Sequence, residues 1–288
     1  MHSALRSAVR TAVDPLADRL AAHAVAALVD EAELSPKPGL VDSRGSGAHS
    51  DLTLALMRRS AATLGPTFLA MALEAQYRAP GIGLREALGA IGRDGEAAMM
   101  HVTQGVNTHR GAIWALGLLV AAAAMQPGDW RPDAVAARAA ALARLPDRGI
   151  PPERRKGDDV CKAYGIRGAR GEAQDGFPHV LTLGLPTLLA SRRRGCNETA
   201  ARLNALLAMM TRLVDTCVLS RGGLPALESM RQGACRVLNA GGVDTLPGRR
   251  ALMQLDQKML ELRASPGGAA DLLAATLLLD RLVSDSSD

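Results

Sequence analysis

The stretch GAIWALGLLVAAAAM, residues 111–125, is the longest apolar run in the sequence and decides the fold. A membrane-spanning helix needs about 20 apolar residues, so this run is too short to cross a bilayer. Alanine and leucine favour the helical state, and the run has no polar face. We therefore predict a helix that starts near Asn107 or Thr108, continues to Ala124 and is buried at the centre of the protein.

The composition extends the helical prediction to the whole chain. Hydrophobic residues make up 48% of the 288 residues, which is enough for a substantial core, yet only two Trp, two Tyr and two Phe are present. Runs of β-branched residues are nearly absent, so helices are favoured over strands. We expect an all-α protein, a single compact multi-helix domain over residues 1–288 whose ends, 1–15 and 284–288, are frayed.

Periodic apolar residues predict the other helices, and prolines or glycines separate them. The expected helices cover residues 16–31, 51–76, 84–103, 132–145, 178–193, 198–219, 224–239, 249–263 and 266–282. Asp51 is the expected N-cap of the second of these. Residues 146–176 are rich in Gly, Arg, Asp and Pro without periodicity. We expect a long functional loop there, and the alternative is a disordered one.

Charge and cysteine content restrict the class of partner. The formal net charge of +5 suits phosphates or other acidic ligands. Nucleic acid is not an expected partner, because the aromatic residues are too few for base stacking and no Lys/Arg block resembles a docking face. The four cysteines have neither zinc-ligand spacing nor a disulfide framework. We expect a cytoplasmic protein without membrane contact, since no signal-peptide pattern is present.

Five polar segments interrupt the helices and contain the residue types of an anionic-ligand site. They are SPKPGLVDSRGSGAHSD (35–51), GVNTHRG (105–111), GIRGARGEAQDG (165–176), DTCVLSRGG (215–223) and SPGGAAD (265–271). Pro36 and Pro38 hold Lys37 between two rigid joints. Glycines at helix starts expose backbone N–H groups that bind anions, and arginine pairs bidentately with phosphate. Each segment alone also fits a solvated loop or a helix cap.

Two of these segments give further local predictions. Asp271 stands one turn into an otherwise apolar helix, where an unpaired carboxylate is costly, so we predict that it has a partner. Gly222 fits the C′ position of a helix that ends in the fourth segment.

The ordered set of these segments resembles the triphosphoribosyl-dephospho-coenzyme A synthase family. The matching strings are SPKPGLVD…GAHSD, GVNTHRG, GARGEAQDGFP, SRGG and SPGGAADLL, and the match runs from about Ala32 to Leu279. The resemblance implies an all-helical enzyme that joins ATP to 3′-dephospho-CoA, releases adenine and uses Mg²⁺ with ATP. Cys217, Arg110 and Phe177 depart from the citrate-lyase branch, where asparagine, lysine and tyrosine are expected, and favour the malonate decarboxylase branch.

The resemblance also implies a set of site residues. The implied chemistry is one inverting displacement on ribose, with a base and a leaving-group acid on opposite faces, by analogy with inverting glycosidases. For proton transfer we expect Asp42, His49, Glu172 and His109, with His109 as the acid for adenine. For substrate binding we expect Lys37, Arg44, Asn107, Arg110, Arg167, Arg170, Ser220, Arg221, Gly222, Gly223 and Asp271. For Mg²⁺ we expect Asp51, Glu96 and Asp215.

Other functions stay open from the sequence alone. The same reaction could serve citrate lyase. A magnesium-dependent helical N-glycohydrolase would cleave a similar bond with water, but its adjacent acidic pairs are missing. A non-catalytic adaptor would hold an acidic acyl carrier protein on a basic surface. If the chain is a triphosphoribosyl-dephospho-CoA synthase, the expected partners are a prosthetic-group transferase and the acyl carrier protein, which receive the product. A homo-oligomer is a further expectation.

Overall fold

Helices, turns and loops make up the computed structural model, which describes residues 14–150 and 156–285, and no strand occurs among these residues. The all-α prediction is therefore confirmed. The ends expected to fray lie mostly outside the described residues. Asp14, Pro15, Ser284 and Asp285 are the exceptions: Asp14 caps the first helix, and the other three belong to the first and last helices.

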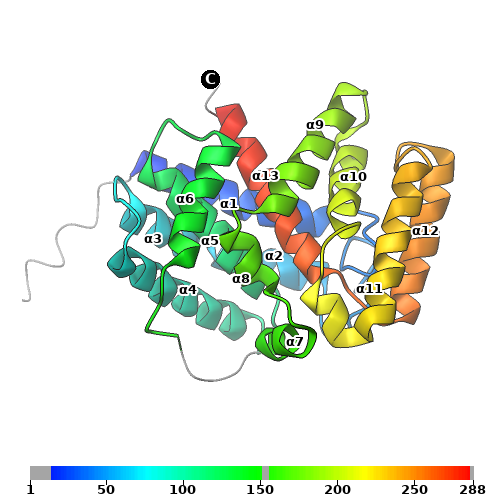
Figure 1. The fold of residues 1–288 in the computed structure, drawn as a ribbon, viewed down its shortest axis with the longest axis horizontal. Helices are drawn as coiled ribbons and strands as arrows, with labels where there is room; N and C mark the ends of the chain where they lie inside the picture. The colour runs from blue at the N-terminus through cyan, green and yellow to red at the C-terminus, as the bar shows by residue number, and fades with distance from the viewer. Residues whose placement is uncertain (1–13, 151–155, 286–288) are drawn as a thin grey trace, which may run out of the picture.

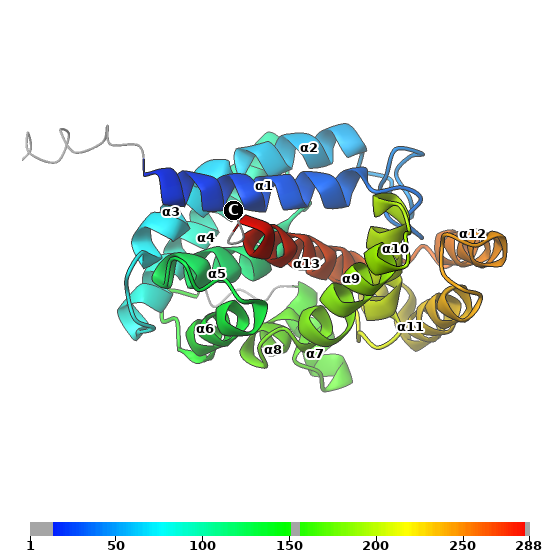
Figure 2. The same ribbon diagram turned by 90° about the horizontal axis from the view of Figure 1, so that it is seen from above.

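The helices follow one another in this order: α1 (Pro15–Glu33), α2 (Leu54–Thr63), α3 (Gly65–Ala75), α4 (Ile82–Val102), α5 (Arg110–Met125), α6 (Pro132–Arg144), α7 (Lys156–Tyr164), α8 (Gly168–Gln174), the π-helix η1 (Val180–Gly184), α9 (Leu185–Arg193), α10 (Glu198–Met210), α11 (Thr216–Asn239), α12 (Leu246–Glu261) and α13 (Gly267–Asp285). Figures 1 and 2 show them as one helical body, with α11 and α12 forming a hairpin at one end.

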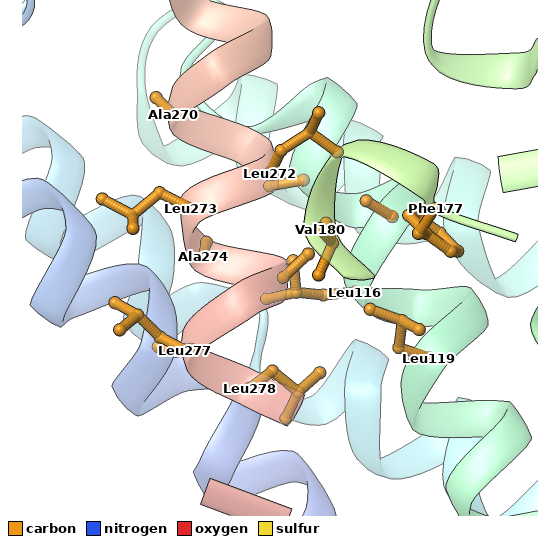
Figure 3. Packing of buried hydrophobic residues seen from close by; sticks show 14 of the residues in the cluster. Leu116, Leu119, Phe177, Val180, Ala270, Leu272, Leu273, Ala274, Leu277 and Leu278 are labelled. Carbon is orange, nitrogen blue, oxygen red and sulfur yellow. The ribbon is translucent and has the colours of Figure 1, made fainter. Parts of the chain in front are cut away.

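Helix α5 is the centre of the core, as the apolar run predicts. Every residue from Ala115 to Met125 is buried, and α5 packs against α1, α3, α6 and α13. Figure 3 shows Leu116 and Leu119 of α5 close to Val180 and Phe177, with Leu272 of α13 beside them. Apolar side chains on facing helices thus exclude water from the middle of the protein, which is the main stabilising term.

The structure corrects the expected helix over residues 51–76. Leu64 separates α2 from α3, and Pro66 occupies the first turn of α3, where its missing N–H costs nothing. Thr53 caps α2 by accepting a hydrogen bond from the Leu56 N–H, so the expected cap Asp51 lies outside the helix. The apolar periodicity of the sequence continues across Leu64 and therefore does not indicate the break between α2 and α3.

The region around residues 210–225 also differs from the prediction. Helix α10 ends at Met210, and Asp215 caps the start of α11 instead of lying inside a helix. The predicted helix end in the fourth segment is confirmed, but it lies at Gly223 and not at Gly222, because α11 consists of two helical parts that meet at this kink. The backbone continues through Gly223, which has a φ of 63° and kinks α11, before Pro225 begins the next turn. The expected loop over 146–176 contains two helices, α7 and α8, while residues 151–155 lie outside the described part.

No helix in the described part of the chain is long and apolar enough to cross a membrane. This matches the sequence prediction for residues 111–125.

Candidate active site

The N-terminal ends of four helices lie next to one another, although they are far apart in the sequence. A Cβ added at Gly168 of α8 would lie 3.2 Å from Cγ2 of Thr216 in α11, and one at Gly267 of α13 would lie 3.0 Å from Sγ of Cys217. A Cβ added at Gly111 of α5 would lie 2.0 Å from Oδ2 of Asp271. Glycine is thus required at residue 111 for the close approach of α5 and α13.

We call this group of four helix starts the helix-end cluster; it comprises residues 110–112, 168–170, 215–217 and 267–271. The Trp114 indole N–H donates to the Ala169 carbonyl at 3.2 Å and links α5 to α8. Figure 1 shows α7, α8 and the start of α11 near one another at the lower edge of the body. Each helix start carries a partial positive charge, so four together favour an anionic ligand.

Two carboxylates already lie in the helix-end cluster. Asp215 is buried and accepts hydrogen bonds from the backbone N–H groups of Cys217 (2.8 Å), Val218 (3.2 Å) and Ala269 (2.9 Å). Burial raises its pKa, although these N–H groups act in the opposite direction. Asp215 therefore ties the start of α11 to the start of α13.

Asp271 is the second carboxylate, and the prediction that it has a partner is confirmed. The backbone N–H of Ala112, in the first turn of α5, bonds to it. Burial raises the pKa of Asp271 well above its ordinary value, and the nearby charges of Glu31 and Asp215 raise it further. A carboxyl group in this position binds a proton at a pH where an exposed aspartate would be ionised.

Lys37 enters the same region from the loop that follows α1. Its side chain is 1% exposed, and Nζ donates to Glu31 Oε1 and to the Glu31 carbonyl, each at 2.6 Å. Lys37 is thus a buried cation held between α1 and the acidic side of the helix-end cluster. Glu31 was not predicted as a site residue, because it follows the apolar stripe of α1 and the sequence around it has no motif that marks a site.

His109 precedes α5 and is 2% exposed. Its Nδ1 lies 2.7 Å from Ser60 Oγ, and its Nε2 has no hydrogen-bond partner. Burial lowers the pKa of His109 to about 4, and the charge of Lys37 adds to the shift. The imidazole is therefore neutral at pH 7, and Lys37 and His109 lie in the same buried region.

Hydrogen bonds of Asp42 and Arg44 hold the loop formed by the first polar segment. Asp42 is buried and accepts from the Lys37 N–H and the Arg44 N–H, each at 2.8 Å, and from the Arg44 guanidinium. Burial raises the pKa of Asp42, but the bonds from Arg44 and Lys37 outweigh it and the net shift is downward. Arg44 also donates to Asp256 at 2.6 Å. Both residues are thus engaged in holding the loop.

His49, Asp51 and Arg221 form a more exposed group. Arg221 Nη2 lies 3.0 Å from His49 Nδ1, and its Nη1 donates to the Ala48 carbonyl at 3.4 Å. Burial and the Arg221 charge lower the pKa of His49 to about 4. Arg221 also interacts electrostatically with Cys217. The first and fourth polar segments therefore meet beside the helix-end cluster, with Ser220, Gly222 and Gly223 in the kinked turn of α11.

A second group of cations lies on the α4 side of the cluster. Arg110 pairs with Glu96 at 2.5 Å, and its N–H donates to Asn107 Oδ1 at 3.2 Å. Arg170 lies within electrostatic reach of Arg85, whose guanidinium is 5.1 Å from the centre of the Trp114 ring. Arg85 was not predicted as a site residue either, because like Glu31 it lies inside a helix, on the buried face of α4.

Two expected residues of the third segment are engaged in local pairs. Glu172 accepts from the His179 N–H at 2.9 Å and lies 2.7 Å from its Nδ1. Arg167 pairs with Asp175, and both are exposed. Arg167 directly precedes the start of α8, but its guanidinium pairs with Asp175, and Glu172 pairs with His179 further along the same segment.

The three carboxylates expected to bind Mg²⁺ lie in different surroundings. Asp51 is 3.7 Å from His49, Glu96 pairs with Arg110, and Asp215 is held by backbone N–H groups. No group of three or more His, Cys, Asp or Glu side chains with metal-binding geometry occurs among the described residues. The arrangement contains no all-protein metal cage there, and Mg²⁺ that is bound mainly by phosphates does not require one.

Comparisons with known proteins cover nearly the whole chain. A family model described as ATP:dephospho-CoA triphosphoribosyl transferase matches residues 17–288. A Klebsiella pneumoniae protein named 2-(5''-triphosphoribosyl)-3'-dephosphocoenzyme-A synthase is 60% identical over 263 residues, which cover 91% of this chain and 94% of that protein. A Stutzerimonas stutzeri protein with the same name, preceded by "Probable", is 61% identical over 274 residues and 94% of both chains. A crystal structure from Archaeoglobus fulgidus has a similar fold, with a TM-score of 0.50 at 19% identity over 77% of this chain and 96% of that one.

Proposed function

This chain belongs to the ATP:dephospho-CoA triphosphoribosyl transferase family, and from that premise we propose that it transfers the triphosphoribosyl group of ATP to the ribose 2′-hydroxyl of 3′-dephospho-CoA and releases adenine. The structural observation that supports this proposal is the helix-end cluster. Asp215 and Asp271 already accept from the N–H groups at the starts of α5, α11 and α13, and arginines from separate segments lie around these carboxylates, where phosphates of two anionic substrates would bind.

Cations from separate segments support phosphate binding at this position. Arg110 and Arg170 lie on the α5 and α8 side of the helix-end cluster, and Arg221 lies on the α11 side. We propose that these three arginines bind the triphosphate and diphosphate groups, because a guanidinium pairs bidentately with phosphate oxygens. The Lys37 ammonium pairs with the Glu31 carboxylate inside the protein. We propose that Lys37 affects the electrostatic potential at the site without contacting the substrates.

Asp271 is the proposed proton donor to the leaving adenine. A general acid needs a raised pKa, and burial with the neighbouring Glu31 and Asp215 charges gives Asp271 one. Asp42, Glu172 and His49 were expected as proton acceptors, but each already interacts with Arg44, His179 or Arg221. We propose that these three residues position loops and do not transfer protons.

Mg²⁺ is proposed to enter with the triphosphate, where it would neutralise phosphate charge. Asp51 fits best as the carboxylate beside it. Its side chain is 60% exposed and contacts His49, which in turn contacts Arg221. Asp215, by contrast, already accepts hydrogen bonds from backbone N–H groups.

The proposed metabolic role is the malonate decarboxylase branch. The product would pass to a prosthetic-group transferase and then to the acyl carrier protein of that enzyme. Cys217 and Arg110, two of the three residues that favour this branch, both lie in the helix-end cluster. Mass spectrometry of the carrier proteins after gene inactivation tests the branch: loss of the group from the malonate decarboxylase carrier supports it, and loss only from citrate lyase contradicts it.

The reaction itself is tested by adenine release, measured by chromatography with ATP and dephospho-CoA together and with ATP alone. We expect adenine only when both substrates are present. Release with ATP alone would indicate a glycohydrolase, and no release with both would refute the proposal. Asp271→Asn should lower kcat roughly 10²- to 10⁴-fold, the range of general acid–base catalysis. Asp280→Asn is the matched control, because Asp280 lies on the same helix and pairs with Arg192.

A further inference from the structure

Three side chains form a hydrogen-bonded chain beneath the start of α5. Ser60 Oγ, from α2, lies 2.6 Å from Thr108 Oγ1 and 2.7 Å from His109 Nδ1. Ser60 is fully buried, and the His109 backbone N–H contacts Met99 Sδ at 3.2 Å. Ser60 therefore holds the imidazole of His109 at Nδ1, Met99 holds its backbone, and the ring nitrogen Nε2 has no partner.

Two arrangements of the protons are possible in this chain. Either Thr108 donates to Ser60 and Ser60 donates to Nδ1, which leaves a buried N–H at Nε2, or the order is reversed and Nε2 carries a lone pair. A buried N–H without an acceptor is rarer and more costly than an acceptor without a donor. In the reversed order the Thr108 hydroxyl proton has no protein acceptor, but Thr108 is only half-buried and water can accept it.

The surrounding charge keeps the ring neutral. Lys37 is the charged group that acts on His109, and its ammonium already donates twice to Glu31. Burial and a nearby positive charge both disfavour a protonated ring. The ring therefore carries one N–H, and the cost of a buried N–H without an acceptor places it at Nδ1 and the lone pair at Nε2.

We infer that Ser60 and Thr108 are positioning residues that hold His109 as the Nδ1–H tautomer, with Nε2 presented to the substrates as a hydrogen-bond acceptor. The identity of its donor rests on the proposed function: the 2′-hydroxyl of dephospho-CoA. In that step the hydroxyl proton moves to Nε2 as its oxygen bonds to C1′ of ATP. The C1′–N9 bond breaks with its electron pair on adenine, which takes a proton from Asp271. Bound phosphates raise the basicity of His109, because a nearby negative charge favours imidazolium.

The tautomer can be measured without any turnover. Nitrogen-15 NMR of the full chain with labelled histidine distinguishes a ring N–H from a lone pair, and His109→Gln assigns the signal among the six histidines. We expect a neutral ring with the proton on Nδ1 in the wild type. A proton on Nε2, or an equal mixture of tautomers, would overturn the inference.

Thr108→Val is the sharpest variant, since it removes the acceptor for Ser60 while keeping the shape of the side chain. Ser60 then has only Nδ1 as an acceptor, so the proton should move to Nε2. We expect kcat to fall about 10- to 100-fold with KM changed less than threefold, part of the 10²- to 10⁴-fold contribution of a general base. Thr63→Val, the same change on α2 at a hydroxyl that donates to the Arg59 carbonyl, should alter neither quantity.

Ser60→Ala gives a second readout. Because it removes both hydrogen bonds, the variant should show a mixture of tautomers and an altered pH profile of kcat. An unchanged tautomer in both Thr108→Val and Ser60→Ala would refute the positioning role. If the wild type shows the expected tautomer but releases no adenine, the proposed function fails while the positioning of the ring stands.

Discussion

Replacing Lys37 by methionine should destabilise the protein strongly, because the change leaves the Glu31 carboxylate buried without its cation. The two side chains are 1% and 5% exposed, and Nζ lies 2.6 Å from Oε1. Removing one partner of a buried ion pair costs about 3–5 kcal/mol. A typical domain has a stability of about 5–15 kcal/mol, so Lys37→Met should remove a large share of it.

The double variant Lys37→Met with Glu31→Met separates the ion pair from packing. It removes both charges at similar volume, and such replacements are often neutral or stabilising. Equilibrium urea unfolding followed by circular dichroism should place it within about 1 kcal/mol of the wild type. Lys258→Met is the matched control, since Lys258 pairs with Glu261 at 3.6 Å on the surface and should contribute less than about 1 kcal/mol. A loss below about 1 kcal/mol for Lys37→Met, or a double variant as unstable as the single one, would refute the reasoning.

Three further predictions concern the helix-end cluster and a surface ion pair. Gly111→Ala should lower kcat at least about tenfold with the fold retained, because its Cβ would displace the Asp271 carboxylate, whereas Gly83→Ala at the second position of α4 meets nothing within 4 Å and should keep full activity. Asp271→Asn should raise the melting temperature at pH 8, because burial raises the pKa of the wild-type carboxyl in the folded state, so that the wild type loses stability as the pH rises above the pKa of the unfolded chain; the difference should shrink as the pH falls. Arg192 is the main cause that lowers the pKa of Glu198 to about 2, so Glu198 stabilises the fold above pH 4.5 and loses this effect as the pH falls toward 2. Urea titrations of Glu198→Gln should show a loss below about 1 kcal/mol at pH 7, because the side chain is 42% exposed, and almost none at pH 2.

The sequence predicted most of the fold, because helix periodicity and proline punctuation are local. The run over residues 111–125 forms the buried α5, and Pro132 begins α6 as expected. The break at Leu64 was missed, since the apolar pattern continues across it while the chain changes direction. The short helices α7 and α8 were missed for a different reason: their glycines oppose helix formation, so packing against α11 and α6 stabilises them.

The candidate site was predictable only where glycine or proline marks a helix end. His109, Arg170, Arg221 and Asp271 carry such signals, and the structure places them in or beside one cluster. Glu31, Ser60 and Arg85 carry none, because each occupies a helical position whose burial depends on tertiary packing. A polar residue on a helix that lacks a cap or a glycine beside it gives no sign of a functional role in the sequence.

Helix α5 combines the tightest part of the core with one wall of the candidate site. Its four consecutive alanines, residues 121–124, are at most 1% exposed, so neighbouring helices approach its backbone closely and no larger side chain fits. A larger side chain there would push α5 and its neighbours apart, and a shift of α5 would move Gly111 relative to Asp271. Substitution of these alanines is therefore limited by catalytic activity as well as by stability. Homologues with a larger side chain at one of these positions should have a smaller side chain at the facing position of α3 or α13.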